Sequence, residues 1–342
     1  MAINKKQAGV IVAGVAAVAL IGGGITWAVL AGNNSAEAAD SGAKSSTEEQ
    51  VEAATQFDLT SQNAADRPTI EPVAAAVEAL EESGFEPIEA GKLTVAISPW
   101  AAPLGVLASD DDTTVIGTEA DFGSLIADGL GLEYNPVAVN WADWPLGIQS
   151  GKYDLIASNV TVTEERKELY DFASYRQDLL GFYVQADSDI DSISEAADIS
   201  GLKIVVGSGT NQEKILLAWN EELEADGEAP AELVYYDDQA AATLAVTSGR
   251  VDATFGPNAT SAYQAATTGE TKLVGTINGG WPETAPIAAG TAKGNGLIEP
   301  VQLVLQSIID DGTYDEVLER WALTSEALDA SEINPPGLPK SE

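Results

Sequence analysis

The sequence contains no cysteine and no histidine. The chain therefore has no thiol or imidazole nucleophile, no Ser-His-Asp triad, no zinc finger and no histidine-bound metal. A metal would have to be held by carboxylates, and the sequence has no calcium-binding loop of the D-x-D-x-D-G type. We expect no metal, no other cofactor and no catalytic residue, and the chain needs no disulfide to fold.

Positive charge is also scarce. The chain has 16 lysines and arginines against 54 acidic residues, which gives a formal net charge of -38. Nucleic-acid binding depends on basic side chains that neutralise phosphates, so we expect no nucleic-acid partner. Because the acidic residues are spread along the chain, we interpret them as a solvated surface rather than as an acidic functional patch.

One long apolar run lies near the N-terminus, at residues 8–31, and Lys5 and Lys6 precede it. Positive charge before such a run favours insertion with the N-terminus inside, and the run could span a bilayer core of about 30 Å. Ala36-Glu37-Ala38 has the small-residue pattern of a cleavage site. Residues 1–38 are thus predicted to be either a signal peptide or a membrane anchor. Both place the remaining chain outside the cytoplasm, and lipoprotein attachment is excluded because there is no cysteine to acylate.

Residues 39–90 are rich in small, polar and acidic side chains and are predicted to be a flexible linker. Within this linker we expect one short helix at 73–82, which Ser83 and Gly84 would end. The folded part is expected to begin at Lys92.

From Lys92 onward, apolar β-prone runs alternate with segments of helical periodicity, which predicts an α/β fold with mainly parallel sheets flanked by helices. Strands are expected at 93–97, 134–139, 155–157, 202–206, 233–236, 251–255 and 287–291, and helices at 120–130, 144–150, 211–219, 239–248, 298–310 and 314–323. Two successive strand-helix sets followed by one strand and two helices indicate two lobes, with the chain returning to the first.

The stretch from Ser150 to Arg166 reads SGKYDLIASNVTVTEER and carries the clearest sign of a binding site. A short buried strand leads into a polar loop, and the loop ends at an arginine. A guanidinium group matches a carboxylate through two parallel hydrogen bonds, and the hydroxyl of Thr161 could donate to the same anion. The alternative is an ordinary strand, loop and surface arginine.

Several motifs occur together and in order along the chain: G-x-L-x-V (91–95), S-G-K-Y-D (150–154), T-x-T-E-E-R (161–166), D-F-A-S-Y (171–175), V-G-S-G-T (206–210), G-R-V-D-A (249–253), A-K-G-N (292–295) and D-G-T-Y…W (311–321). With these motifs the chain resembles the family 3 (polar amino acid type) extracellular solute-binding proteins of ABC importers. The resemblance covers residues 91–323.

The resemblance implies a two-lobed, periplasmic-binding-protein-like fold of type II, in which the ligand binds in the cleft between the lobes. Lobe 1 would comprise 91–183 plus 278–330, lobe 2 would comprise 184–277, and 331–342 would be a C-terminal tail. The two extended strands that cross between the lobes would lie near Phe182-Tyr183-Val184 and Leu273-Val274-Gly275.

The resemblance also implies which residues bind the ligand. Arg166 would hold the ligand carboxylate, and residues of both lobes would assist it: Ser158, Asn159 and Thr161 from lobe 1, and Thr210 and Asn211 from lobe 2. Trp141 would form an aromatic wall of the cleft, with an ordinary core tryptophan as the alternative.

The chain departs from the family where many members bind the ligand's ammonium group. The two acidic residues expected there are replaced by Ser98 and Pro257. An unpaired buried ammonium group is costly. Either Glu119 or the neighbouring Asp121 substitutes, or the ligand has no free α-ammonium and Asn258 hydrogen-bonds another polar group.

The function implied is that of a monomeric, extracytoplasmic binding component, which captures an amino acid or related small carboxylate and delivers it to permease subunits. Two alternatives remain. A periplasmic dehydratase-like enzyme on the same scaffold would need an acid or base poised over its substrate. A ligand-sensing ectodomain anchored through residues 8–31 would have to act through a partner protein.

Overall fold

The structure is a computed structural model, and it describes residues 57–236 and 239–340. The predicted signal peptide or anchor over 1–38 lies outside the described residues. Within those two ranges, no helix combines the length and the apolar character that crossing a membrane requires.

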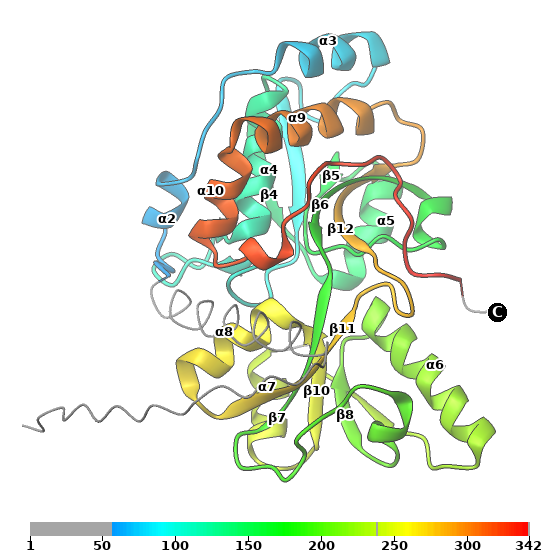
Figure 1. The fold of residues 1–342 in the computed structure, drawn as a ribbon. Helices are drawn as coiled ribbons and strands as arrows, with labels where there is room; N and C mark the ends of the chain where they lie inside the picture. Colours follow the sequence, from blue (N-terminus) through cyan, green and yellow to red (C-terminus); the bar gives the residue numbers. More distant parts are fainter. Residues whose placement is uncertain (1–56, 237–238, 341–342) are drawn as a thin grey trace, which may run out of the picture. The chain divides into compact units, whose positions relative to one another are not determined.

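Lobe 1 contains a five-stranded sheet in the order β4-β1-β5-β12-β6 (Figure 1). Its strands are β1 (Lys92–Ile97), β4 (Glu133–Ala138), β5 (Leu155–Ile156), β6 (Tyr170–Gln177) and β12 (Pro286–Ala292). β1 runs parallel to β4 and β5, whereas β12 is antiparallel to both of its neighbours. A separate two-stranded sheet pairs β2 (Val106–Leu107) with β3 (Val115–Ile116).

Lobe 2 contains a second five-stranded sheet in the order β11-β7-β10-β8-β9. Its strands are β7 (Leu179–Gln185), β8 (Lys203–Val206), β9 (Glu232–Tyr235), β10 (Ala253–Pro257) and β11 (Thr271–Asn278). Here β7 is the strand that runs against the others. In each lobe, the reversed strand is the one that directly follows a crossing from the other lobe.

Helices cover the sheets of both lobes. In lobe 1 they are α2 (Gln62–Ala65), α3 (Ala74–Ser83), α4 (Thr118–Gly129), α5 (Trp144–Gln149), α9 (Ile298–Asp311) and α10 (Thr313–Arg320). In lobe 2 they are α6 (Asn211–Asp226), α7 (Gln239–Thr247) and α8 (Asn258–Thr268). Helix α9 shows the sequence basis of this packing, because Val301, Val304, Leu305 and Ile308 are spaced on one face and are fully buried.

The α/β class and the two-lobed type II fold are confirmed. The sheets are mixed rather than uniformly parallel, since each has one reversed strand. Helix α8 was not expected from the sequence. Its run of alanine, serine and threonine residues has no apolar stripe of helical period.

The crossings between the lobes differ from the expectation. Residues 182–184 and 273–275 lie inside the lobe 2 sheet, where β7 and β11 pair along their length. The chain instead crosses first at Asp178, between β6 and β7, and returns through residues 279–285, between β11 and β12. The extended hydrogen-bonded pairing of β7 with β10 and β11 assigns these strands to lobe 2.

The predicted flexible linker is wrong for its described part, residues 57–90. Six partly buried apolar side chains in this segment pack on the lobe 1 core: Phe57, Leu59, Ile70, Val73, Leu80 and Phe85. Helix α3 lies against α9, close to the predicted position, and Gly84 in the left-handed conformation ends it (Figure 1). These scattered apolar residues are enough for docking because α9 provides the surface that faces α3.

The C-terminal tail is also packed over its described residues. Ile333 pairs with Ala173 of β6, and Leu338 pairs with Thr163. Leu338 is buried and belongs to the apolar cluster of lobe 2. The segment 331–338 therefore contacts both lobes.

Candidate ligand-binding site

The loop that follows β5 is fixed to the ends of two other elements. The Ser98 amide donates to Ser158 Oγ at 2.7 Å, and the Asn159 amide donates to Glu119 Oε2 at 2.7 Å. Asn159 has a φ of 51°, a left-handed conformation that asparagine tolerates better than most residues. These bonds tie the loop to the end of β1 and to the first turn of α4.

The same loop continues between two extended segments. The Val162 amide donates to the Pro286 carbonyl at 2.9 Å on the β12 side. On the opposite side, the Leu338 amide donates to the Val162 carbonyl at 3.0 Å. Thr161 and Arg166, which this loop carries, are thus positioned by β12 and by the C-terminal segment together.

Arg166 bridges the lobes. Its Nη1 donates to the Thr161 carbonyl at 2.8 Å, and its Nη2 donates to the Gly209 carbonyl of lobe 2 at 3.2 Å. The guanidinium carbon lies 5.6 Å from the ring centre of Trp141 and 5.7 Å from that of Trp144, which is the geometry of a cation–π contact. Burial lowers the pKa of Arg166 to about 10, and the group remains protonated at neutral pH.

No carboxylate forms an ion pair with Arg166 in the part of the chain that the structure describes, although the neighbouring Lys167 and Lys214 each have one. The guanidinium group donates hydrogen bonds only to two carbonyl groups among the described residues, so it keeps unused donors, because this side chain has five N–H groups in a fixed fork. Arg166 is therefore suited to receive a carboxylate from outside the chain.

Asp178, at the first crossing, joins the loop to helix α6. Thr161 Oγ1 donates to Asp178 Oδ2 at 2.6 Å, and Asn211 Nδ2 donates to the same oxygen at 2.8 Å. Asn211 also donates to the Gly279 carbonyl at 2.9 Å, at the start of the second crossing. Burial raises the pKa of Asp178, which these hydrogen bonds and the nearby guanidinium groups oppose.

Thr210 caps helix α6. Its hydroxyl accepts from the Glu213 amide at 3.2 Å and donates to the Gly207 carbonyl at 2.7 Å. The Glu213 carboxylate accepts from the Gly209 amide at 2.6 Å. The Thr210 hydroxyl is therefore engaged by the helix terminus, whereas the Asn211 side chain reaches both crossings between the lobes.

Trp141 is partly buried and packs on an apolar cluster that includes Trp144 and Tyr170. Its ring centre is 6.1 Å from that of Trp144, and the guanidinium of Arg166 lies over its ring. Trp141 thus supports the orientation of Arg166, and its role as a cleft wall stays a prediction.

Glu119 holds the loop that follows β5 through hydrogen bonds. It accepts hydrogen bonds from the Asn159 amide, from the Tyr175 hydroxyl and, at 2.9 Å, from Arg176 Nη2. Arg176 also pairs with Glu326. Glu119 is therefore part of a buried ion network, and its carboxylate is already bonded to a protein cation.

Two other predicted polar residues lie apart from this cluster. Asp121 accepts from Arg67 Nε at 2.9 Å and from Trp321 Nε1 at 2.7 Å. Asn258 Oδ1 accepts from the Tyr183 hydroxyl at 3.0 Å, at the start of α8. Among the described residues, neither Asp121 nor Asn258 forms a hydrogen bond or ion pair with Arg166.

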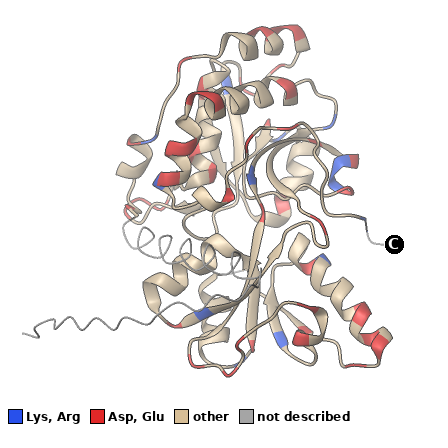
Figure 2. Cartoon of the chain, viewed as in Figure 1, with Lys and Arg blue, Asp and Glu red and all other residues tan. Residues whose placement is uncertain are grey.

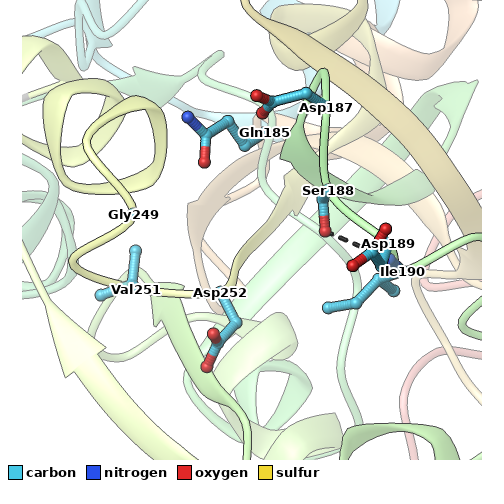
Figure 3. A pocket seen from close by; sticks show the side chains of 8 residues that line it. All are labelled: Gln185, Asp187, Ser188, Asp189, Ile190, Gly249, Val251 and Asp252. Atoms are coloured by element: carbon cyan, nitrogen blue, oxygen red, sulfur yellow. Dashed lines mark hydrogen bonds between the residues drawn. The ribbon is translucent and has the colours of Figure 1, made fainter.

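A separate hollow of about 320 Å³ lies in lobe 2, between the end of β7 and the start of β10 (Figure 3). It is lined by Gln185, Asp187, Ser188, Asp189, Ile190, Gly249, Val251 and Asp252. Asp252 accepts from the Lys203 amide at 2.7 Å, so it has a structural partner. None of the predicted binding residues lines this hollow.

Figure 2 shows acidic residues on elements of both lobes, in line with a solvated surface.

Comparisons with known proteins identify the family of this chain. Residues 93–324 match the model of the family described as bacterial extracellular solute-binding proteins, family 3. The arginine-binding protein ArgT of Corynebacterium glutamicum is 26% identical over 71% of this chain and 78% of its own length. The L-cystine-binding protein TcyJ of Escherichia coli K12 is 26% identical over 68% of this chain and 83% of its own length.

Two solved structures show the same fold. An ancestral arginine-binding protein bound to arginine superposes with a TM-score of 0.60 and 27% identity over 68% of this chain and 98% of its own. The ancestral amino acid-binding protein AncCDT-1, described as a precursor of cyclohexadienyl dehydratase, has a TM-score of 0.58 and 25% identity over 72% of this chain and 98% of its own. The family match covers most of the chain, and the described protein has the fold of its relatives. The chain belongs to the family 3 extracellular solute-binding proteins.

Proposed function

We propose that this protein is the solute-binding component of an ABC importer, which captures an amino acid or related small carboxylate between its lobes and delivers it to permease subunits. The family and the named ligands of the relatives support the solute class. The arrangement around Arg166 supports the place where the carboxylate binds.

The observation that carries the proposal is the unpaired guanidinium of Arg166. It contacts the Thr161 carbonyl in lobe 1 and the Gly209 carbonyl in lobe 2, and it has no carboxylate partner in the described ranges. Desolvation of an unpaired charge is unfavourable, so an incoming carboxylate gains more here than at an exposed arginine.

Ligand binding and lobe closure are linked through the same contacts. The bond from Arg166 to Gly209 and the bond from Asn211 to Asp178 both join lobe 2 to residues outside it. A ligand that adds bonds to both sides has a higher affinity for the closed arrangement than for an open one, and it shifts the population toward closure.

The test is the Arg166→Ala variant, with Arg250→Ala as a matched control, because Arg250 is exposed on lobe 2. Isothermal titration with the standard L-amino acids should give micromolar binding for the wild type and for the control, corresponding to about -8 kcal/mol. Arg166→Ala should lose at least about 100-fold in affinity, given about 1.4 kcal/mol per factor of ten. Wild-type affinity in Arg166→Ala would contradict this assignment.

We further propose that the protein binds its ligand without changing it, acts as a monomer and works outside the cytoplasm. The assembled site needs only hydrogen bonds and ion pairs for this function. Mass spectrometry of the ligand after prolonged incubation should recover it unchanged. A dehydrated product would instead favour the dehydratase-like alternative, in which a buried acid such as Asp178 serves as the proton donor.

A further inference from the structure

We propose that Asp178 receives the ammonium group of the ligand, so that this site selects an amino acid over the same carboxylic acid without its amine. This inference rests on the proposed function and deepens it. Neither the family resemblance nor the motifs point to this residue, because the family's ammonium-binding acids correspond here to Ser98 and Pro257.

The first argument is position. Asp178 lies at the crossing from lobe 1 to lobe 2 and accepts from the hydroxyl of Thr161 and the amide of Asn211. Thr161 is also the residue whose carbonyl accepts from Arg166. Arg166 and Asp178 both contact Thr161, so a ligand carboxylate on Arg166 and an ammonium group at Asp178 would both lie beside this residue, which suits the short separation of the two charges in an α-amino acid.

The second argument is charge. Asp178 interacts electrostatically with the guanidinium groups of Arg166 and Arg176, and Arg176 interacts with Glu119 and Glu326. Burial raises the pKa of Glu326 to about 7, so the two guanidinium charges are balanced chiefly by the carboxylates of Asp178 and Glu119. A ligand carboxylate without an amine would add an uncompensated negative charge at low dielectric, whereas a zwitterion adds no net charge.

The third argument is that the other candidate acids, Glu119 and Asp121, are already paired with arginine side chains of the protein. Glu119 is bonded to Arg176 and the Asn159 amide, and Asp121 is bonded to Arg67 and Trp321. The two bonds that Asp178 accepts come from neutral groups, a hydroxyl and an amide. An ammonium group beside it would supply the positive charge that these neutral donors do not.

The experiment compares affinities within one variant. Each standard L-amino acid is titrated against the wild type together with the carboxylic acid in which hydrogen replaces its α-ammonium. For the amino acid that binds best, the wild type should favour the amine-bearing member by at least about tenfold, a difference of about 1.4 kcal/mol. In Asp178→Asn, the affinities of the two members of the pair should differ by no more than about threefold, chiefly because the affinity for the amino acid falls.

The ratio of the two affinities distinguishes a loss of recognition from a loss of folding. A partly unfolded variant loses affinity for both members of the pair to the same extent, so its ratio does not change. Thr161→Val provides the second variant, since it removes one hydrogen bond to Asp178 and retains the charge. Thr161→Val should lower the affinity for both members of the pair by similar factors, so the ratio of the two affinities should stay at the wild-type value. An unchanged ratio in Asp178→Asn, or an equal loss of the ratio in Thr161→Val, overturns the inference.

The Arg166→Ala variant distinguishes this inference from the proposed function. If Arg166→Ala abolishes binding of both members while Asp178→Asn leaves the ratio unchanged, the solute-binding function stands and the role of Asp178 fails. If the wild type binds none of the paired probes, both fail.

Discussion

Phe57 stacks on Tyr263 of helix α8, with ring centres 5.4 Å apart and ring planes 24° apart. The same phenylalanine lies 5.2 Å from the ring centre of Trp321 in lobe 1. Phe57 belongs to the segment that leads into lobe 1, and Tyr263 belongs to lobe 2. One aromatic ring therefore contacts both lobes.

We predict that Phe57→Ala weakens ligand binding. The lost stack is worth about 0.5–1.5 kcal/mol beyond burial, and it stabilises the arrangement in which the lobes are in contact. Affinity should fall by about two- to tenfold in isothermal titration. Phe57→Leu, which retains apolar volume, should lose less. Unchanged affinity in Phe57→Ala would show that the stack does not favour closure.

Glu119→Gln should destabilise the protein by about 1–3 kcal/mol, measured by urea unfolding. The substitution removes one of the two carboxylates that pair with buried Arg176 and leaves Glu326 in place. Glu89→Gln is the matched control, because the Glu89–Lys92 pair is more than half exposed on the carboxylate side, at 53%. An exposed pair contributes only about 0–1 kcal/mol. Equal losses in both variants would contradict the importance of burial.

The stability of the domain should fall as the pH rises from about 4.5 to about 7, in part because of Glu326. Burial raises the pKa of Glu326 from its ordinary value of 4.5 to about 7, against the opposing effect of Arg176. In this window the folded protein holds a proton that the unfolded chain has released, so folding weakens with increasing pH by up to about 1.4 kcal/mol per unit.

Urea midpoints at successive pH values test this expectation. Glu326→Gln removes the titrating group and keeps an acceptor for Arg176, so its stability should depend less on pH than that of the wild type. Identical slopes for the two proteins would assign the pH dependence to other groups.

Gly337→Ala should lower both thermal stability and ligand affinity. An added Cβ at this position would lie 2.3 Å from the Val162 carbonyl oxygen, next to Thr161 in the binding loop. Overpacking of this kind costs about 1–3 kcal/mol. Gly256→Ala makes the same chemical change where nothing lies within 4 Å, and it should affect calorimetric stability far less. Equal melting temperatures for Gly337→Ala and the wild type would contradict the packing of the C-terminal segment.

The sequence predicted most strands and helices because their apolar periodicity is local. It also pointed to Arg166 and Thr161, because they stand in one short motif after a strand. Asp178 gave no such signal, since its role depends on where β6 ends and β7 begins, and that depends on pairing with distant strands. The docking of Phe57 and Leu338 was not predictable for the same reason. Their partners, Tyr263 and the 160–164 loop, are far away in the sequence.

The central place of β12 in the lobe 1 sheet has a consequence for the order of folding during synthesis. β6 pairs only with β12 in the sheet order, and β12 follows the whole of lobe 2 in the chain. All five strands of the lobe 2 sheet leave the ribosome before β12 does, so that sheet can complete itself first. Until residues 286–292 have been synthesised, the edge of β5 that later pairs with β12 stays unpaired, and the lobe 1 sheet cannot be completed.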